Sequence, residues 1–211
     1  MKQNLLNPTH IGVRKIILAA VFLTVAISVA SLSGCTAMNA QNPSGALKPS
    51  NVTTDDQGVA LMLKGADVVA YFTDAKYMQG AATFQSTYEN VIFRFSSANN
   101  KALFDKEPAK YIPQYNGFCA NGIVYGIPWG GDADTFKMVS GKLYIFGGAG
   151  SRDGWNLDEA KNVALADKYW TEEIKDSNSF IQRSKRMVMR VPHYKSGETL
   201  AAEVAAAKAK S

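Results

Sequence analysis

The sequence predicts an α+β fold: a small domain of short antiparallel hairpins packed with two or three helices, followed by a helical C-terminal extension. Nineteen of its 22 aromatic residues lie between Tyr71 and Trp170. Because aromatic side chains dominate buried cores, the globular part is expected there. That stretch contains two pairs of apolar runs, and a two-residue turn separates the runs of each pair, as in antiparallel hairpins. A segment with helical spacing of apolar residues follows each pair.

The first predicted hairpin joins residues 82–88 to residues 91–95 through the turn Glu89-Asn90. Successive side chains of a strand point to opposite faces, so the second strand has one wholly apolar face. That face carries Val91, Phe93 and Phe95. Ser97 is a favourable N-cap for a helix that runs to about Lys106.

The second predicted hairpin joins residues 136–139 to residues 143–146 through the turn Ser140-Gly141. A helix is then predicted from Asn156, with a glutamate three residues later to complete a capping box, and it ends at about Trp170. Spacing predicts the residues on its buried face. They are Leu157, Ala160, Val163 and Ala164.

The first 34 residues indicate a secretory signal rather than part of the fold. They contain three basic and no acidic residues, and their apolar run over 16–30 is shorter than the roughly 18–20 residues that span a membrane. The closing Leu32-Ser33-Gly34-Cys35 resembles the lipobox of bacterial lipoproteins, which implies cleavage before Cys35 and its acylation. An uncleaved signal anchor is the alternative. Thr36, which is not aspartate, implies sorting to the outer membrane, with the chain facing the periplasm.

Composition excludes several classes of protein. The chain carries 23 Lys and Arg against 18 Asp and Glu, a formal charge of +5. Beyond residue 34 the count is 20 against 18, so the basicity belongs largely to the targeting signal. A nearly neutral mature chain favours neither nucleic acid nor acidic substrates. Two cysteines are too few for a disulfide scaffold or an all-cysteine zinc site.

The mature chain divides into three predicted parts. Residues 35–58 contain no aromatic residue and many small polar ones, which predicts a flexible tether. Residues 59–172 form the predicted domain. Residues 173–211 are basic and then alanine-rich, and we expect them to form a peripheral helical extension.

Three segments resemble the YHS domains of bacterial proteins. Residues 65–72 are similar to the opening motif G-x-D-P-V-A-Y-F, and residues 92–100 to the motif Y-H-F-x-S-x-E-N. Residues 104–120 are similar to the core F-x-x-x-P-x-K-Y-x-P-Q-Y-x-G-Y-C-A. The resemblance implies a small secreted or tethered domain associated with metal handling. It departs from the family at Val68, which replaces proline, and at Phe93-Arg94, which replaces a Tyr-His pair and so removes a potential ligand.

Cys119 is the one thiol besides the proposed lipid attachment site, and three roles are open for it. It is a buried apolar residue, as most free cysteines are. Alternatively it is a ligand of a soft metal ion such as Cu(I) or zinc, or a haem-type ligand; the cofactor is unknown, and a soft metal ion is the candidate that the sequence suggests. The third role is a nucleophilic or redox thiol, which requires a lowered pKa.

Other side chains offer partners for Cys119. A small-molecule pocket could be built from aromatic walls and two polar groups, although the same aromatic residues could equally form core. These candidates are Tyr111, Tyr115, Tyr125 and Trp129, with Asp67 and Arg94. His193, the only histidine of the mature chain, could form a dyad with the thiol. Met187 and Met189 could bind Cu(I), but the basic residues around them favour apolar docking onto the domain or contact with anionic lipid.

We therefore expect a lipid-anchored protein of the cell envelope whose domain binds a small ligand or a metal ion at or near Cys119, without catalysis. Membrane lipid attached through Cys35 is the expected partner; no nucleic acid is expected, and the sequence identifies no protein partner. Two alternatives remain open: a thiol-dependent redox or transfer enzyme that uses Cys119, and a structural envelope module that docks a partner.

Overall fold

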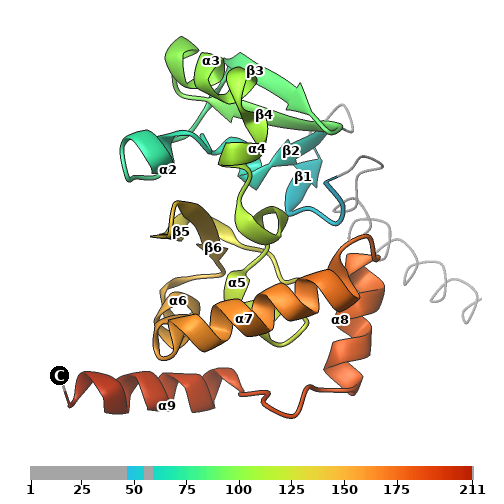
Figure 1. Cartoon of the computed structure of the whole chain (residues 1–211), viewed down its shortest axis with the longest axis vertical. Helices are drawn as coiled ribbons and strands as arrows, with labels where there is room; N and C mark the ends of the chain where they lie inside the picture. Colours follow the sequence, from blue (N-terminus) through green and yellow to red (C-terminus); the bar gives the residue numbers. More distant parts are fainter. Residues whose placement is uncertain (1–46, 55–58, 211) are drawn as a thin grey trace, which may run out of the picture. The chain divides into compact units, whose positions relative to one another are not determined.

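The computed structural model describes residues 47–54 and 59–210, and this part of the chain has the predicted α+β fold (Figure 1). The predicted signal segment and Cys35 lie outside the described residues. The described chain forms a four-stranded sheet, a two-stranded sheet and helices that together enclose two clusters of buried apolar residues. Among these residues, no helix has the length and apolar character needed to cross a bilayer.

The four-stranded sheet has the strand order β1-β2-β4-β3. The predicted first hairpin is confirmed by the antiparallel pair of β3 (Ala81–Tyr88) and β4 (Val91–Phe95). Both turn residues, Glu89 and Asn90, have positive φ, as the favoured two-residue hairpin turn requires. The short strand β2 (Ala60–Met62) pairs in parallel with β4.

Strand β1 (Val52–Thr54) belongs to the fold, although the sequence predicted a tether there. It pairs antiparallel with β2 and buries Val52. The neighbouring Asn51 side chain donates hydrogen bonds to the carbonyls of Gly117 (2.9 Å) and Gly131 (3.0 Å). Strand pairing uses backbone groups, so a segment without aromatic residues can still join a sheet.

The first core lies on the apolar face predicted for β4, which is fully buried. Phe104 of α3 (Ala98–Lys106) packs there, with its ring centroid 4.7 Å from that of Phe93 and 5.0 Å from that of Phe95. Ser97 caps α3 as predicted and accepts a hydrogen bond from the Asn100 N–H at 3.1 Å. Short helical segments flank this core: η1 (Leu63–Gly65), α2 (Ala70–Thr73), α4 (Pro108–Tyr111) and η2 (Gln114–Gly117).

The second predicted hairpin is confirmed by β5 (Asp132–Val139) and β6 (Lys142–Phe146), which turn at Ser140 and Gly141 with positive φ. β6 contributes to both cores. Leu143 and Ile145 belong to the first core, whereas Tyr144 and Phe146 belong to the second. The second core also receives α5 (Ala120–Val124).

Two helices follow β6 where the sequence predicted one. These are α6 (Ala149–Asn156) and α7 (Glu159–Tyr169), which continues as the π-helical turn η3 (Trp170–Ile174). The predicted N-cap was wrong, because Asn156 ends α6 and Asp158 caps α7. The predicted buried face was right for Val163, which packs against the second core, and wrong for the other three residues. Leu157, Ala160 and Ala164 are exposed, and the fully buried residue of α7 is Ala166. Alanine is compatible with either face, so spacing alone did not select one.

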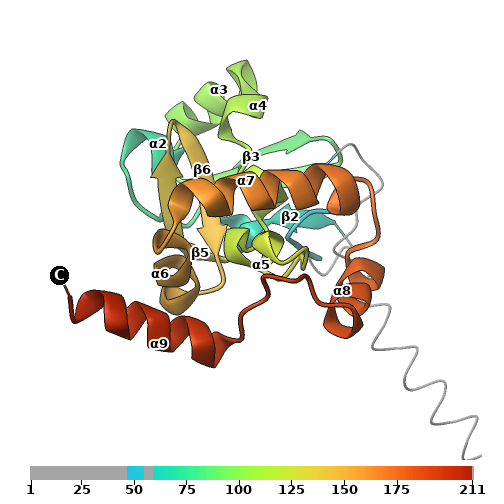
Figure 2. The same cartoon turned by 60° about the horizontal axis from the view of Figure 1, so that its bottom comes forward.

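The extension is helical, with α8 (Ser179–Val188) and α9 (Gly197–Lys208). It begins from the second core, where Ile174 is fully buried, and Val191 between the two helices is buried there as well. Figure 2 shows α9 next to α6. The extension therefore packs on the domain and takes part in the second core.

Candidate functional site

A cavity of about 720 Å³ lies between α9 and the part of the domain that carries Cys119. Three parts of the chain form its walls: the start of α5, the glycine-rich turn that leads into α6, and one face of α9. Tyr125 and Trp129 contribute aromatic surface, so the structure brings two of the predicted aromatic residues together with Cys119.

Cys119 is the N-cap of α5 and is only 4% exposed. Two backbone contacts fix its position. Its N–H donates to the Trp129 carbonyl at 2.9 Å, and the residue forms an isolated parallel β-bridge with Ile145 of β6. Its Sγ lies 3.0 Å from the Oγ of Ser151. The thiol is therefore buried and also forms part of the cavity wall.

The turn before α6 brings the hydroxyl of Ser151 to the thiol. Gly148 is the N-cap of α6 and has a φ of 131°, which side chains of L-residues rarely adopt. Ser151 lies in the first turn of α6, where its N–H donates to the Gly148 carbonyl at 3.1 Å. Gly131, directly before β5, lies close to β6. A Cβ at this position would be 2.5 Å from Ile145 Cγ2, so only glycine allows these two segments to approach so closely.

Asn121 is a polar residue of the site that sequence reasoning missed. It is 7% exposed and lines the cavity, and its side-chain amide makes no hydrogen bond to any residue that the structure describes. An amide at the cavity wall without a protein partner can donate to and accept from a ligand atom. The only sequence signal was an asparagine within a run of small and apolar residues.

Helix α9 supplies the other wall, which the sequence did not predict either. The lining residues recur at helical spacing and form one face. They are Gly197, Leu200, Ala201, Val204, Ala205 and Lys208. Lys208 Nζ binds Asp153 Oδ2 of α6 at 2.7 Å, which ties the end of α9 to the domain. This hydrogen bond also holds the pKa of Asp153 below its usual value.

Tyr125 adds a neutral phenol to the cavity wall. Burial, together with the nearby carboxylate of Glu203, raises the pKa of Tyr125 to about 12. The hydroxyl therefore stays protonated at neutral pH. The opposite aromatic residue, Trp129, is 41% exposed and lies where the cavity meets solvent.

Tyr111 and Tyr115 lie in the two cores and do not line the cavity. Tyr111 packs edge-on against Phe72 at a centroid distance of 5.2 Å. Tyr115 belongs to the second core, where its hydroxyl donates to Asp167 Oδ1 at 2.9 Å. Burial, and then the Asp167 carboxylate, raise the pKa of Tyr115 well above its usual value. Both tyrosines therefore have the structural role that the sequence left as their alternative.

Asp67 is fully buried and organises the first core. Its Oδ1 accepts from the backbone N–H groups of Val69 (2.9 Å) and Ala70 (3.3 Å), which start α2. Its Oδ2 accepts from the N–H and hydroxyl of Ser96 (2.8 and 2.7 Å) and from the Asn100 amide (2.7 Å). These five hydrogen bonds occupy both carboxylate oxygens and join the start of α2 to the segment between β4 and α3.

Arg94 also lies away from the cavity. It is a residue of β4 between two core-facing phenylalanines, so its side chain points to the opposite face of the strand. There its Cδ is close to Gly65, and its buried Nε makes no hydrogen bond within the described residues. The polar pair predicted from Asp67 and Arg94 is therefore not placed beside Cys119.

His193 and the two methionines of the extension have other surroundings. The His193 ring stacks on Tyr125, and its Nε2 donates to the Val124 carbonyl at 2.9 Å, which holds this nitrogen away from the thiol. Met187 and Met189 are 64% and 59% exposed. Within residues 47–54 and 59–210, no three His, Cys, Asp or Glu side chains are grouped as a metal site would require.

No family model, curated protein or solved structure matches this chain. The resemblance to YHS domains therefore stays a prediction, and the geometry of the cavity is the basis for inferring a function.

Proposed function

We propose that the domain binds a small, largely apolar molecule in the cavity beneath α9, and that acylated Cys35 holds the protein at an envelope membrane. The main support is a cavity of about 720 Å³ whose wall contains a buried thiol beside a hydroxyl, together with the side chain of Asn121. Small-molecule sites typically have volumes of about 300–1,000 Å³, apolar walls and a few polar groups.

The walls define the chemistry of the ligand. Leu200, Val204 and Trp129 favour an apolar body. Lys195 and Lys208 also line the cavity, but they are ion-paired with Glu203 and Asp153. A neutral polar end, such as a carbonyl, hydroxyl or amide that can pair with Asn121, is therefore favoured over a carboxylate.

A metal ion at Cys119 is the second candidate that the sequence raised, and the same experiment tests it. The group nearest the thiol is a neutral hydroxyl, which is a weak ligand for the soft ions that thiolates bind. A thiol-based reaction has less support, because the imidazole of His193 is hydrogen-bonded to a backbone carbonyl.

Two substitutions on α9 test the cavity. Both Ala201 and its neighbour Ala202 are exposed to solvent, but only Ala201 lines the cavity. We expect Ala201→Phe to fill the space and abolish binding of N-phenyl-1-naphthylamine, a neutral dye that fluoresces in apolar sites. Ala202→Phe adds the same side chain outside the cavity and should bind the dye as wild type does. Any dye bound by the N-terminal segment is common to all three full-length proteins.

Equal dye binding by the two variants would contradict the proposed site. Mass spectrometry under native conditions should also show a co-purified organic molecule in wild type and in Ala202→Phe but not in Ala201→Phe. Elemental analysis separates the metal candidate: one equivalent of metal that is lost in Cys119→Ser and kept in Ala201→Phe would replace the proposed ligand with an ion.

A further inference from the structure

The outer side of α8 exposes a group of large apolar side chains. Ile181, Met187, Val188 and Met189 are 66%, 64%, 85% and 59% exposed, and they account for four of the seven exposed large apolar residues in the described chain. Ile181 and Val188 are separated by two helical turns and therefore lie on the same side of the helix. We call these four residues the α8 surface.

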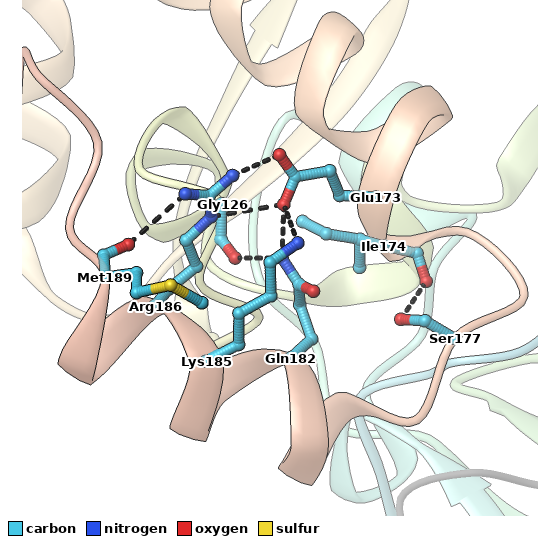
Figure 3. Close-up of polar contacts among 8 residues, drawn as sticks. All are labelled: Gly126, Glu173, Ile174, Ser177, Gln182, Lys185, Arg186 and Met189. Carbon is cyan, nitrogen blue, oxygen red and sulfur yellow. Dashed lines mark hydrogen bonds and ion pairs between the residues drawn. The ribbon is translucent and has the colours of Figure 1, made fainter.

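A polar network attaches α8 to the domain mainly through Gln182 and Arg186, which lie on a different side of the helix from Ile181 and Val188 (Figure 3). Glu173 Oε2 accepts from Gln182 Nε2 (3.0 Å), Lys185 Nζ (3.0 Å) and Arg186 Nε (3.1 Å), and a further Arg186 nitrogen binds Oε1. Gln182 also donates to the Gly126 carbonyl at 3.0 Å. The orientation of α8 is therefore set by buried polar contacts that would be broken if the helix rotated.

The charge around the α8 surface is net positive, although Glu173 pairs with Lys185 and Arg186, and Glu203 pairs with Lys195. Residues 177–197 contain five Lys and Arg and no Asp or Glu. Arg190 is exposed immediately after the apolar group, with its guanidinium 4.4 Å from the Tyr194 ring centroid. Exposed apolar residues within a basic segment are typical of helices that lie in the interface of an anionic membrane.

The described chain begins beside α8. The Lys48 carbonyl accepts a hydrogen bond from the Asp176 N–H at 3.2 Å, three residues before α8 begins at Ser179. Cys35 precedes Lys48 by 13 residues, and an extended chain of that length spans at most about 45 Å. A lipid on Cys35 would therefore keep the start of α8 within this distance of the membrane.

From these observations we propose that the α8 surface docks on anionic lipid headgroups, with its apolar side chains in the interface and the neighbouring Arg190 at the phosphates. The occupant is a lipid surface because residues 177–197 carry five basic residues and no acidic one, so that pairing with a second copy would bring net positive charges together. This site is separate from the cavity, since no residue of the α8 surface lines it.

The native methionines report on docking. Hydrogen peroxide oxidises exposed methionine to the sulfoxide, and peptide mass spectrometry gives the rate at each position. The full-length protein is reconstituted into vesicles of phosphatidylcholine alone or of equal parts of phosphatidylcholine and phosphatidylglycerol. We expect Met187 and Met189 to oxidise at least about fivefold more slowly on the anionic vesicles, because one basic residue at such a surface shifts binding by about that factor. Met138 of β5 is the internal reference and should not change.

A matched pair of variants completes the test. Ile181→Glu places a carboxylate in the α8 surface, and a glutamate in the first turn of a helix favours the helix. Ala164→Glu adds the same charge at an exposed position of α7. Ile181→Glu should restore fast oxidation on anionic vesicles, and Ala164→Glu should not. Equal rates on both vesicle types would overturn the proposal, and so would protection that follows protein density rather than lipid charge, because that would identify a second copy as the occupant.

Discussion

Glu173→Gln should loosen the attachment of α8. The side chains of Glu173 and Arg186 are only 18% and 14% exposed, and the carboxylate also accepts from Gln182 and Lys185. Glutamine keeps the shape of the side chain but removes its charge. Glutamine also replaces one of the two acceptor oxygens by an NH2 donor, which would face the donors of Gln182, Lys185 or Arg186, while the Met189 carbonyl still accepts from Arg186 at 3.2 Å.

The expected loss follows from the exposure of the groups. Removing one partner of a buried ion pair costs about 3–5 kcal/mol, whereas exposed pairs contribute about 0–1 kcal/mol. The Glu173–Arg186 pair is largely buried, so its loss should cost an amount near the value for buried pairs. The Lys185 side chain is 41% exposed, so its pairing with Glu173 contributes little to stability. We therefore expect the free energy of unfolding to fall by about 3 kcal/mol.

The effect should depend on pH in a defined direction. Partial burial alone would raise the pKa of Glu173, but hydrogen bonds from Gln182, Lys185 and Arg186, with the Arg186 charge, outweigh it and hold the pKa below its usual value. A carboxyl group with a lowered pKa stabilises the fold above its unfolded pKa, and this contribution is lost as pH falls through the folded pKa. The difference between wild type and Glu173→Gln should therefore be constant near neutral pH and shrink below about pH 4.

Urea unfolding of the full-length protein in detergent measures the loss, and hydrogen exchange of the α8 amides locates it. Glu203→Gln is the matched control, because Glu203 pairs with Lys195 at 2.6 Å while both side chains are 39–44% exposed. That control should lose less than about 1 kcal/mol. A loss in Glu173→Gln no larger than in Glu203→Gln would refute the role assigned to the network.

Two further predictions concern residues that the sequence singled out. Asp67→Asn should lower the free energy of unfolding by about 3 kcal/mol, because an amide donor would face donors from Ser96, Asn100 or the start of α2; urea unfolding with unchanged stability would contradict this. Cys35→Ala should release the protein from membranes into the soluble fraction on cell fractionation, whereas retention at full length would indicate an uncleaved apolar anchor instead of a lipid.

Hairpins and the first helix cap could be predicted because their signals are local. Glu89-Asn90 and Ser140-Gly141 adopt the positive φ that two-residue turns need, and Ser97 caps α3 with its own side chain. The start of α7 was predicted two residues too early because Asn156 and Asp158 are both good caps. Only the packing of α6 decides between them.

The site was predicted less well because distance in sequence was used as a guide to distance in space. Tyr111 is eight residues from Cys119, but the chain turns between them at Tyr115 and Asn116, both with positive φ. This turn directs Tyr111 to the first core and Cys119 to the cavity. The wall from α9 had no signal at all, because an alanine-rich helix without a buried residue has no pronounced apolar face.

The C-terminal extension connects both proposals, since α9 forms a wall of the cavity and α8 carries the exposed apolar surface. The substitutions that test them are nevertheless independent: Ala201→Phe leaves the α8 surface unchanged, and Ile181→Glu leaves the cavity lining unchanged. Loss of dye binding with intact protection of Met187 would therefore separate ligand binding from membrane docking. If docking persists and no ligand is found, the domain functions as an interaction module at the membrane, and the buried thiol of Cys119 is then part of its core.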